Sequence, residues 1–433
     1  MRVVGAVGLA ALVAVVGALG TAAAWASGGG GAGSKVCDVR AFGARGDGAT
    51  KDTTAIQRAI DACAAKRGGG TVRLSGGTFL SAPIVLRSNI TLDVEKGAML
   101  KGSPDHADYP KKMEFRGPGY QALVGAVNAE NVRITGGGVI DGNGESWWVE
   151  ARREKNAGVL GSENSRPRLV VFDHCRHVVM DGVTVENSPM WQIVPYYSDN
   201  VTIRNVKILA DPHSPNTDAI DPFSSSNVLI DHVYADVGDD DVAIKSGMIN
   251  SPGPDAPSKN IVISDCTFKH GHGLSIGSEI AGGAENIRAQ RVTFDGTDNG
   301  IRIKANRDRG ADVSNIVFKD ITMTDVKTAI LVSEYYPKVF PEGEVAAAPV
   351  TRLTPEFHNI TIENVKATGG KTAGVIVGLP EAPVKGITLR NVQIEAQTGM
   401  RIAYAQVTLD HVTVTPAAGE AMTVAKSATV TGK

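Results

Sequence analysis

The chain has 433 residues, 42% of them hydrophobic, and a formal net charge of −2. This length and composition allow a large buried core, and a solenoid of this size can form a single domain. The near-balance of acidic and basic residues excludes a strong general attraction to nucleic acid or to an anionic membrane surface.

The first 26 residues have the features of a secretory signal peptide. Arg2 precedes an apolar run from Val3 to Leu19, and Ala24-Trp25-Ala26 is a typical cleavage site. Because the apolar run is slightly long, an uncleaved membrane anchor is the alternative. Residues 27–35 are rich in glycine and predict a flexible linker. We therefore expect a secreted protein, extracellular or periplasmic, with one domain at residues 36–433.

Residues Thr53 to Lys66 predict an amphipathic helix. Ile56, Ile60 and Cys63 lie on one face of it, and Asp52 is the candidate N-cap. A solenoid exposes its core at an open end, so we expect this helix to cover that end.

Four cysteines allow three disulfide connectivities, and export permits disulfides. Cys37 opens the strand just before the helix, so we predict a Cys37–Cys63 bridge. Cys266 stands where other repeats have valine, which favours a buried free thiol. Cys175 lies in a turn at a different repeat position, so a Cys175–Cys266 bridge is not expected.

A short phrase recurs along the chain: Asn, apolar, any, apolar, two polar, apolar, any, apolar. Its commonest interval is between 23 and 33 residues, and its clearest copies begin at Asn131, His177, Asn200, Asn227, Asn260, Asn286, Asn315 and Asn359. The alternation predicts a strand in each copy, and the repetition predicts stacking. Since a second short strand follows each turn, we expect an all-β, single-stranded, right-handed parallel β-helix with coils about 4.8 Å apart. The repeated asparagines are interpreted as a structural side-chain ladder that satisfies backbone groups of the turns.

Four motifs fall at one recurring position of this repeat: Asn216-Thr217-Asp218, Gly238-Asp239-Asp240, Gly271-His272-Gly273 and Gly300-Ile301-Arg302-Ile303-Lys304. On each coil a polar residue stands two residues before an inward-facing apolar residue, namely Asp218, Asp240, His272 and Asn299. These four should form a ladder on one outer face. Strand alternation points Asp239 away from the direction of Asp240, and it turns Arg302 and Lys304 outward beside the ladder.

Such a patch suits acid/base chemistry on a sugar. Glycoside hydrolysis needs one carboxylic acid to protonate the leaving oxygen and another carboxylate to activate water or to attack directly. Close carboxylates cannot all stay ionised, so one pKa should rise, and His272 could support that proton by a hydrogen bond. Taken singly, each motif is more often an ordinary turn or a solvated surface. Their shared repeat position favours a site, and two cations beside the acids indicate an acidic sugar.

At these residues the sequence resembles the polygalacturonases of glycoside hydrolase family 28, which carry Asn-Thr-Asp, Gly-Asp-Asp, Gly-His-Gly and Arg-Ile-Lys in this order. The likeness runs from about Val36 to the C-terminus and includes Phe42-Gly43-Ala44, Gly46-Asp47-Gly48 and the stretch from Gly136 to Gly142. It implies a pectin-lyase-like parallel β-helix that hydrolyses α-1,4 links between galacturonates with inversion. It implies no metal and no organic cofactor.

The resemblance also implies roles, position by position. Asp239 is the expected general acid, Asp218 and Asp240 are expected to activate water together, and His272 is expected to support the protonation of the acid. The substrate-binding residues that it implies are Arg302, Lys304, Asn216 and Tyr336, the last in preference to Tyr335. Inversion further requires about 6.5–9.5 Å between acid and base, expected between Asp239 and Asp218.

Two residues depart from the family pattern. Asp241 stands where other coils carry a small residue, which leaves the pH optimum open, and Ala219 replaces a frequent glycine.

Trp147 is a candidate for stacking on a sugar ring, whereas edge packing is the better interpretation of Trp148 and Trp191. The loop from Pro337 to Phe357 is expected to wall one end of the cleft.

Other functions remain compatible with the same fold. They are exo action, hydrolysis of rhamnogalacturonan or xylogalacturonan, a calcium-dependent pectate lyase, and a non-catalytic polysaccharide-binding solenoid. His272 and the Arg-Ile-Lys motif argue against the lyase. The expected partner is an acidic polysaccharide, pectin or polygalacturonate, with no nucleic acid, no membrane after signal cleavage, and a monomeric protein.

Overall fold

The computed structural model describes residues 35–432, apart from 115–116, 160–165, 250–255 and 341–344. The predicted signal peptide and nearly all of the predicted linker lie outside the described residues. In the described part of the chain, no helix is long and apolar enough to cross a membrane.

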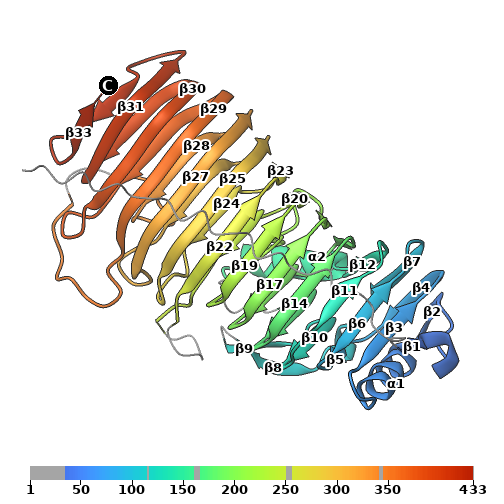
Figure 1. Ribbon diagram of the computed structural model, residues 1–433. Helices are drawn as coiled ribbons and strands as arrows, with labels where there is room; N and C mark the ends of the chain where they lie inside the picture. Colours follow the sequence, from blue (N-terminus) through green and yellow to red (C-terminus); the bar gives the residue numbers. More distant parts are fainter. Residues whose placement is uncertain (1–34, 115–116, 160–165, 250–255, 341–344, 433) are drawn as a thin grey trace, which may run out of the picture. The chain divides into compact units, whose positions relative to one another are not determined.

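The recurring phrases form strands that pair in parallel from each coil to the next (Figure 1). This first ladder comprises β1 (Val36–Asp38), β3 (Gly70–Leu74), β6 (Ile90–Val94), β11 (Arg133–Thr135), β14 (Arg176–Asp181), β17 (Asp199–Arg204), β19 (Ser226–Asp231), β22 (Ser258–Ser264), β25 (Ala284–Asp295), β27 (Asp312–Thr324), β29 (Glu356–Val377), β30 (Val384–Ala403), β31 (Ala405–Pro416) and β33 (Thr429–Gly432).

Two further ladders complete each coil. The second comprises β2 (Asp47–Lys51), β4 (Gly77–Ser81), β7 (Ala98–Gly102), β12 (Val139–Asp141), β15 (Thr184–Glu186), β18 (Lys207–Leu209), β20 (Tyr234–Val237), β23 (Thr267–His270) and later parts of the long strands. The third comprises β5 (Ile84–Leu86), β10 (Val124–Val127), β13 (Val170–Asp173), β16 (Ile193–Tyr196), β21 (Val242–Ile244), β24 (Leu274–Gly277), β26 (Asn299–Lys304), β28 (Thr328–Ser333), the ends of β29 and β30, and β32 (Met422–Val424). The predicted parallel β-helix is confirmed.

The remaining elements lie outside the three parallel ladders. They are the antiparallel hairpin β8 (Lys111–Glu114) and β9 (Gly117–Tyr120), the short helices η1 (Val39–Phe42) and η2 (His106–Asp108), and the helices α1 (Thr53–Ala64) and α2 (Glu145–Asn156).

Helix α1 packs against β1, β3 and β5 at the N-terminal end of the stack (Figure 1). Its face with Ile56, Ile60 and Cys63 is buried, so the predicted capping helix is confirmed. Asp52 stands at the N-cap position but makes no capping hydrogen bond. Its carboxylate instead accepts the amides of Arg45 and Gly46 at 2.7 and 2.9 Å and closes the preceding loop.

The predicted Cys37–Cys63 disulfide is present and encloses a sequence separation of 26 residues. A cross-link of this span restricts the unfolded chain, an effect of about 3.5 kcal/mol. We expect Cys37→Ser/Cys63→Ser to lower the free energy of unfolding by about this amount, measured by urea denaturation. Dithiothreitol should destabilise the wild type to the same extent, and an unchanged unfolding midpoint in both tests would refute a stabilising bridge.

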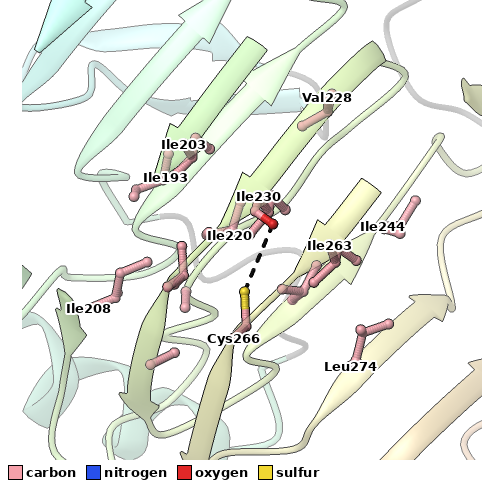
Figure 2. Close-up of a cluster of buried hydrophobic side chains, with 14 of the residues drawn as sticks. Ile193, Ile203, Ile208, Ile220, Val228, Ile230, Ile244, Ile263, Cys266 and Leu274 are labelled. Carbon is pink, nitrogen blue, oxygen red and sulfur yellow. Dashed lines mark hydrogen bonds between the residues drawn. The ribbon is translucent and has the colours of Figure 1, made fainter. Parts of the chain in front are cut away.

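Cys175 and Cys266 are both free and buried, which confirms the buried free thiol predicted at Cys266. Cys266 is 2% exposed among the aliphatic side chains of the core, and its Sγ lies 3.9 Å from the carbonyl oxygen of Ile230 (Figure 2). Burial raises the pKa of the Cys266 thiol to about 12, so it stays protonated and behaves as a small apolar residue.

The repeated asparagines have left-handed backbone angles, with φ of 55° at Asn227, Asn260 and Asn286. Asn is among the few residues that adopt this conformation readily. The side-chain amide of Asn260 donates to Asn227 at 3.1 Å, and that of Asn286 donates to Asn260 at 3.3 Å. The predicted side-chain ladder is present, but these amides bond to each other along the stack, whereas bonds to backbone groups of the turns were expected.

Candidate active site

The four polar positions expected to align do align on the third ladder. Ile220 pairs with Val242, Val242 with Leu274, and Leu274 with Ile301. The residues two positions before these paired residues are Asp218, Asp240, His272 and Asn299, which therefore lie on successive coils. The repeat alone therefore brings together groups that are about 80 residues apart in sequence.

Asp239 is the most accessible of the three candidate carboxylates, with its side chain 19% exposed. Its Oδ1 lies 3.0 Å from Nδ1 of His272 and accepts the amide of Asp240 at 2.9 Å. Its Oδ2 accepts the side-chain amide of Asn216 at 3.3 Å. Asp239 is therefore held by three donors.

The contact between Asp239 and His272 determines which of the two residues is protonated. Burial raises the pKa of Asp239, but the hydrogen bond and charge of His272 outweigh it, so the pKa is lowered. Burial opposes the charged form of His272, yet Asp239 raises its pKa to about 9. Because the pKa of His272 is raised and that of Asp239 is lowered, we expect His272 to hold the proton of this pair at neutral pH. The expected rise in pKa therefore does not fall on Asp239.

Asp240 is buried, with 2% of its surface exposed. Its two oxygens bind Nζ of Lys304 at 2.8 Å and Nη1 of Arg302 at 3.1 Å, and Ser275 donates a further bond at 2.8 Å. Although burial raises the pKa of Asp240, these two cations lower it well below its usual range. Both cations face outward as predicted, but in this structure they hold Asp240 ionised.

Among the three candidate carboxylates, Asp218 is the one whose pKa is raised. Burial first, and then the charge of Asp239, raise the pKa of Asp218 to about 6. Its Oδ2 lies 3.3 Å from Nζ of Lys245, whereas its Oδ1 is buried without a hydrogen-bond partner.

Lys245 was not among the predicted site residues. Its Nζ lies 3.3 Å from Asp218, 3.2 Å from Asp221 and 3.8 Å from Glu279, and its side chain is 6% exposed. These carboxylates raise the pKa of Lys245 despite its burial, so it remains charged. A signal existed in the sequence, because Lys245 follows inward-facing Ile244 as Lys304 follows Ile303.

Arg166 was also not among the predicted site residues. It is buried, and its Nη2 donates to Oδ1 of Asn216 at 2.7 Å. Because arginine only donates, this bond turns the Asn216 amide nitrogen toward Asp239. Arg166 lies 50 residues before Asn216 and outside the recurring phrase, so no sequence pattern connects the two.

The structure separates the two candidate tyrosines. The ring of Tyr336 lies 5.9 Å from the guanidinium carbon of Arg302 and 5.4 Å from Nζ of Lys304. Tyr335 packs instead into an apolar cluster with Leu331 and Val375. Tyr336 is therefore the tyrosine that borders the acids, as expected.

Asp241, the extra acid, is fully buried and accepts the amide of Gly273 at 3.1 Å. Burial raises its pKa well above the usual range, so it keeps its proton to higher pH than its neighbours and adds little charge.

Trp147 does not face a sugar site, contrary to its interpretation as a stacking candidate. It is 3% exposed within α2 and stacks on His106 at 3.5 Å. Trp148 and Trp191 are buried as well, which confirms edge packing for them.

Asp239, Asp240 and His272 bring ligand atoms within 4.8 Å of one another, which is close enough for a metal ion. Both oxygens of Asp240, however, already bind Lys304 and Arg302, and these cations repel another positive charge. The arrangement suits proton transfer better than metal binding.

The chain is similar to known proteins over most of its length. Residues 71–415 match the model for glycosyl hydrolases family 28. A probable polygalacturonase of Vitis vinifera is 32% identical over 377 residues, 82% of this chain and 73% of the relative. An endo-polygalacturonase of Pectobacterium carotovorum subsp. carotovorum is 30% identical over 81% of this chain and 86% of its own. The solved exopolygalacturonase of Thermotoga maritima is 33% identical, with a TM-score of 0.78 over 89% of this chain and 93% of that chain.

These likenesses confirm the predicted glycoside hydrolase of polygalacturonase type, without deciding between exo and endo action. They extend over nearly all of the described coils, including every coil that carries a candidate catalytic residue. The chain belongs to glycosyl hydrolases family 28.

Proposed function

We propose that this chain hydrolyses α-1,4 bonds between galacturonate units of pectin with inversion. The observation that carries the proposal is the division of labour among three adjacent carboxylates. Asp239 shares a proton with His272, Asp240 is held ionised by two cations, and Asp218 keeps one buried oxygen free.

Asp239 is the general acid in this mechanism. The proton on Nδ1 of His272 crosses the 3.0 Å contact to Asp239 as the leaving oxygen gains negative charge, and Asp239 passes it to that oxygen. Asn216 fixes the carboxyl orientation through its 3.3 Å bond.

Asp218 and Asp240 activate the water. Asp218, whose pKa of about 6 lies close to neutral pH, is the proposed acceptor for its proton, and ionised Asp240 supports the developing positive charge on the sugar. Attack from the side opposite the acid inverts the anomeric carbon, which requires about 6.5–9.5 Å between the acid and base carboxyl groups.

Arg302, Lys304 and Tyr336 are the proposed contacts to the galacturonate carboxylate. Arg302 uses one terminal nitrogen, Nη1, for Asp240, and 13% of its side chain is exposed. A guanidinium with unused donors can bind a carboxylate in the forked geometry that arginine favours. This supports an acidic sugar at the cleavage site.

The rate should depend on pH as a bell-shaped curve. Asp218 accepts a proton only when ionised, so kcat/KM should rise as pH passes its pKa of about 6. The acid needs the proton shared by His272 and Asp239, so kcat/KM should fall as pH passes about 9. Initial rates of reducing-end formation at constant ionic strength test this, and a rate that falls as pH rises through 6 would contradict the assignment of Asp218.

Stereochemistry tests inversion directly. Proton NMR of a fresh digest of polygalacturonate should show the β-anomer of the new reducing end before mutarotation. Early accumulation of the α-anomer would mean retention and would remove the water-activating role from Asp218 and Asp240.

We further propose that the protein is exported after cleavage of residues 1–26 and acts as a monomer on pectin or polygalacturonate. The disulfide supports export, because such bonds persist in oxidising compartments. The capped N-terminal end of the stack supports the monomer, since no core is open to another copy there.

A further inference from the structure

A cavity of about 450 Å³ lies on the third ladder near the C-terminal end of the stack. Its lining comes from three consecutive coils, at the ends of β29 and β30 and in the segment around β32. Sites for small molecules and sugars commonly have volumes of about 300–1,000 Å³. We call it the C-terminal cavity, and it lies apart from the residues of the candidate active site.

Arg401, which lines the C-terminal cavity, lies in the same row of the ladder as Arg302. Strand pairing joins Arg302 to Leu331 on the next coil, and Leu331 to Val375 on the coil after it. Val375 pairs in turn with Arg401. Because this pairing preserves the direction of the side chains, both arginines face outward. Three coil steps separate them, about 14 Å along the stack.

The row that contains the candidate catalytic acids also reaches the cavity. Asn299, the fourth member of that row, pairs with Thr328, and Thr328 pairs with Thr372. Thr372 pairs with Thr398, and both of these threonines line the cavity. The cavity and the candidate active site therefore lie on the same face of the stack. A polymer that follows the axis from one of them reaches the other.

The guanidinium of Arg401 has donors available for an anion. Its carbon lies 3.7 Å from the centre of the Phe340 ring, and a stacked guanidinium keeps its N–H donors accessible at its edges. No carboxylate of the described residues pairs with Arg401. Arg390 on the same strand, by contrast, binds Asp410 at 2.9 Å. Arg401 is also exposed, so a ligand can approach it from solvent.

The other polar groups of the lining suit the hydroxyls of a sugar. The carboxylate of Glu420 accepts hydrogen bonds, and threonine hydroxyls both donate and accept them. These hydroxyls belong to Thr372, Thr398 and Thr423. One arginine among such groups matches a sugar acid, because arginine binds a carboxylate with two parallel hydrogen bonds and the remaining groups bind hydroxyls.

We propose, on the basis of the hydrolase function above, that the C-terminal cavity is a second binding site for polygalacturonate. Arg401 binds the carboxylate of one galacturonate unit while another stretch of the same chain lies at the catalytic acids. Two linked contacts raise the affinity for a long chain, because the second contact forms within the complex that the first has made. The cavity therefore favours the polymer over short oligomers.

The test measures kcat and KM for the wild type and for Arg401→Gln on two substrates, polygalacturonate and the shortest oligogalacturonate that the wild type cleaves. The KM on polygalacturonate should rise about tenfold, the usual effect of losing one charge-assisted hydrogen-bonded contact. The kcat should stay the same, because the contact is remote from the reacting atoms. Both constants should stay the same on the short substrate, which has no unit left for the cavity once it occupies the catalytic acids.

Arg390→Gln is the matched control, since it removes one arginine from the same strand outside the cavity. It should leave KM on both substrates at the wild-type value. An unchanged KM of Arg401→Gln on polygalacturonate would overturn the proposal and leave the hydrolase intact. An equal rise on both substrates would also overturn it, because the change would then act on the active site. No reducing ends from the wild type would refute the proposed function, and this proposal with it.

A second arm measures binding without turnover. Titration calorimetry with polygalacturonate compares Asp239→Asn with the double variant Asp239→Asn/Arg401→Gln. The Kd of the double variant should be about tenfold higher, in step with the change in KM. Equal dissociation constants would overturn the proposal.

Discussion

Replacing Asp239 by asparagine is expected to lower kcat on polygalacturonate about 10²–10⁴-fold, the usual contribution of a general acid. Asparagine has the size of aspartate but cannot take up the proton that His272 holds 3.0 Å away. KM should change little, because the cations proposed to bind the substrate carboxylate contact Asp240 and not Asp239. Initial rates at saturating substrate measure the effect.

Asp236→Asn is the matched control for this experiment. Asp236 lies on the same coil, in β20, and bonds the exposed His270 at 2.8 Å, away from the ladder. This variant should keep wild-type kinetics, and both variants should melt near the wild-type temperature. If Asp239→Asn retained the wild-type kcat, Asp239 could not be the acid.

Lys245→Met is expected to have the largest effect on stability among single changes at the site. Lys245 contacts three buried carboxylates, and removal of one partner of a buried ion pair costs about 3–5 kcal/mol. The same change withdraws the cation that lowers the pKa of Asp218, so this pKa should rise above about 6. Urea denaturation measures the first effect. The second appears as a shift of the acidic limb of kcat/KM to higher pH.

Lys269→Met on the neighbouring coil controls for the loss of a lysine. Its ion pair with Asp295 spans 3.0 Å at the surface, where such pairs contribute about 0–1 kcal/mol. Neither stability nor the pH profile should move much in this variant. An acidic limb that stays in place in a folded Lys245→Met protein would show that Lys245 does not set the pKa of Asp218.

The fold was predictable because its rules are local and repeated. Alternation of apolar residues identifies a strand wherever it occurs, and a constant repeat position implies a constant place on the stack. The same logic aligned Asp218 with His272, since strand pairing preserves the offset between coils. The Cys37–Cys63 bridge was predictable because the strand with Cys37 lies just before the helix with Cys63 in the sequence.

Other features depend on distances that a repeat does not specify. The lowered pKa of Asp239 arises from a 3.0 Å contact with His272, whereas close carboxylates alone suggested a rise. Arg166 reaches Asn216 from a segment without the repeat. Trp147 is buried because α2 is an insertion that packs on η2 and its neighbours, and nothing in the recurring phrase indicates where an insertion lies. These contacts join residues that are far apart in the sequence, and they do not recur from coil to coil, so the repeat does not predict them.

We propose that Asp218, Asp239 and Asp240 together hydrolyse a galacturonosidic bond by acid/base catalysis. The most direct measurement follows reducing ends and ultraviolet absorbance together while the purified protein acts on polygalacturonate, with and without a chelator. We expect reducing ends without absorbance, at a rate that the chelator does not change. Unsaturated products that absorb in the ultraviolet and disappear when calcium is removed would contradict it, because they would show a lyase.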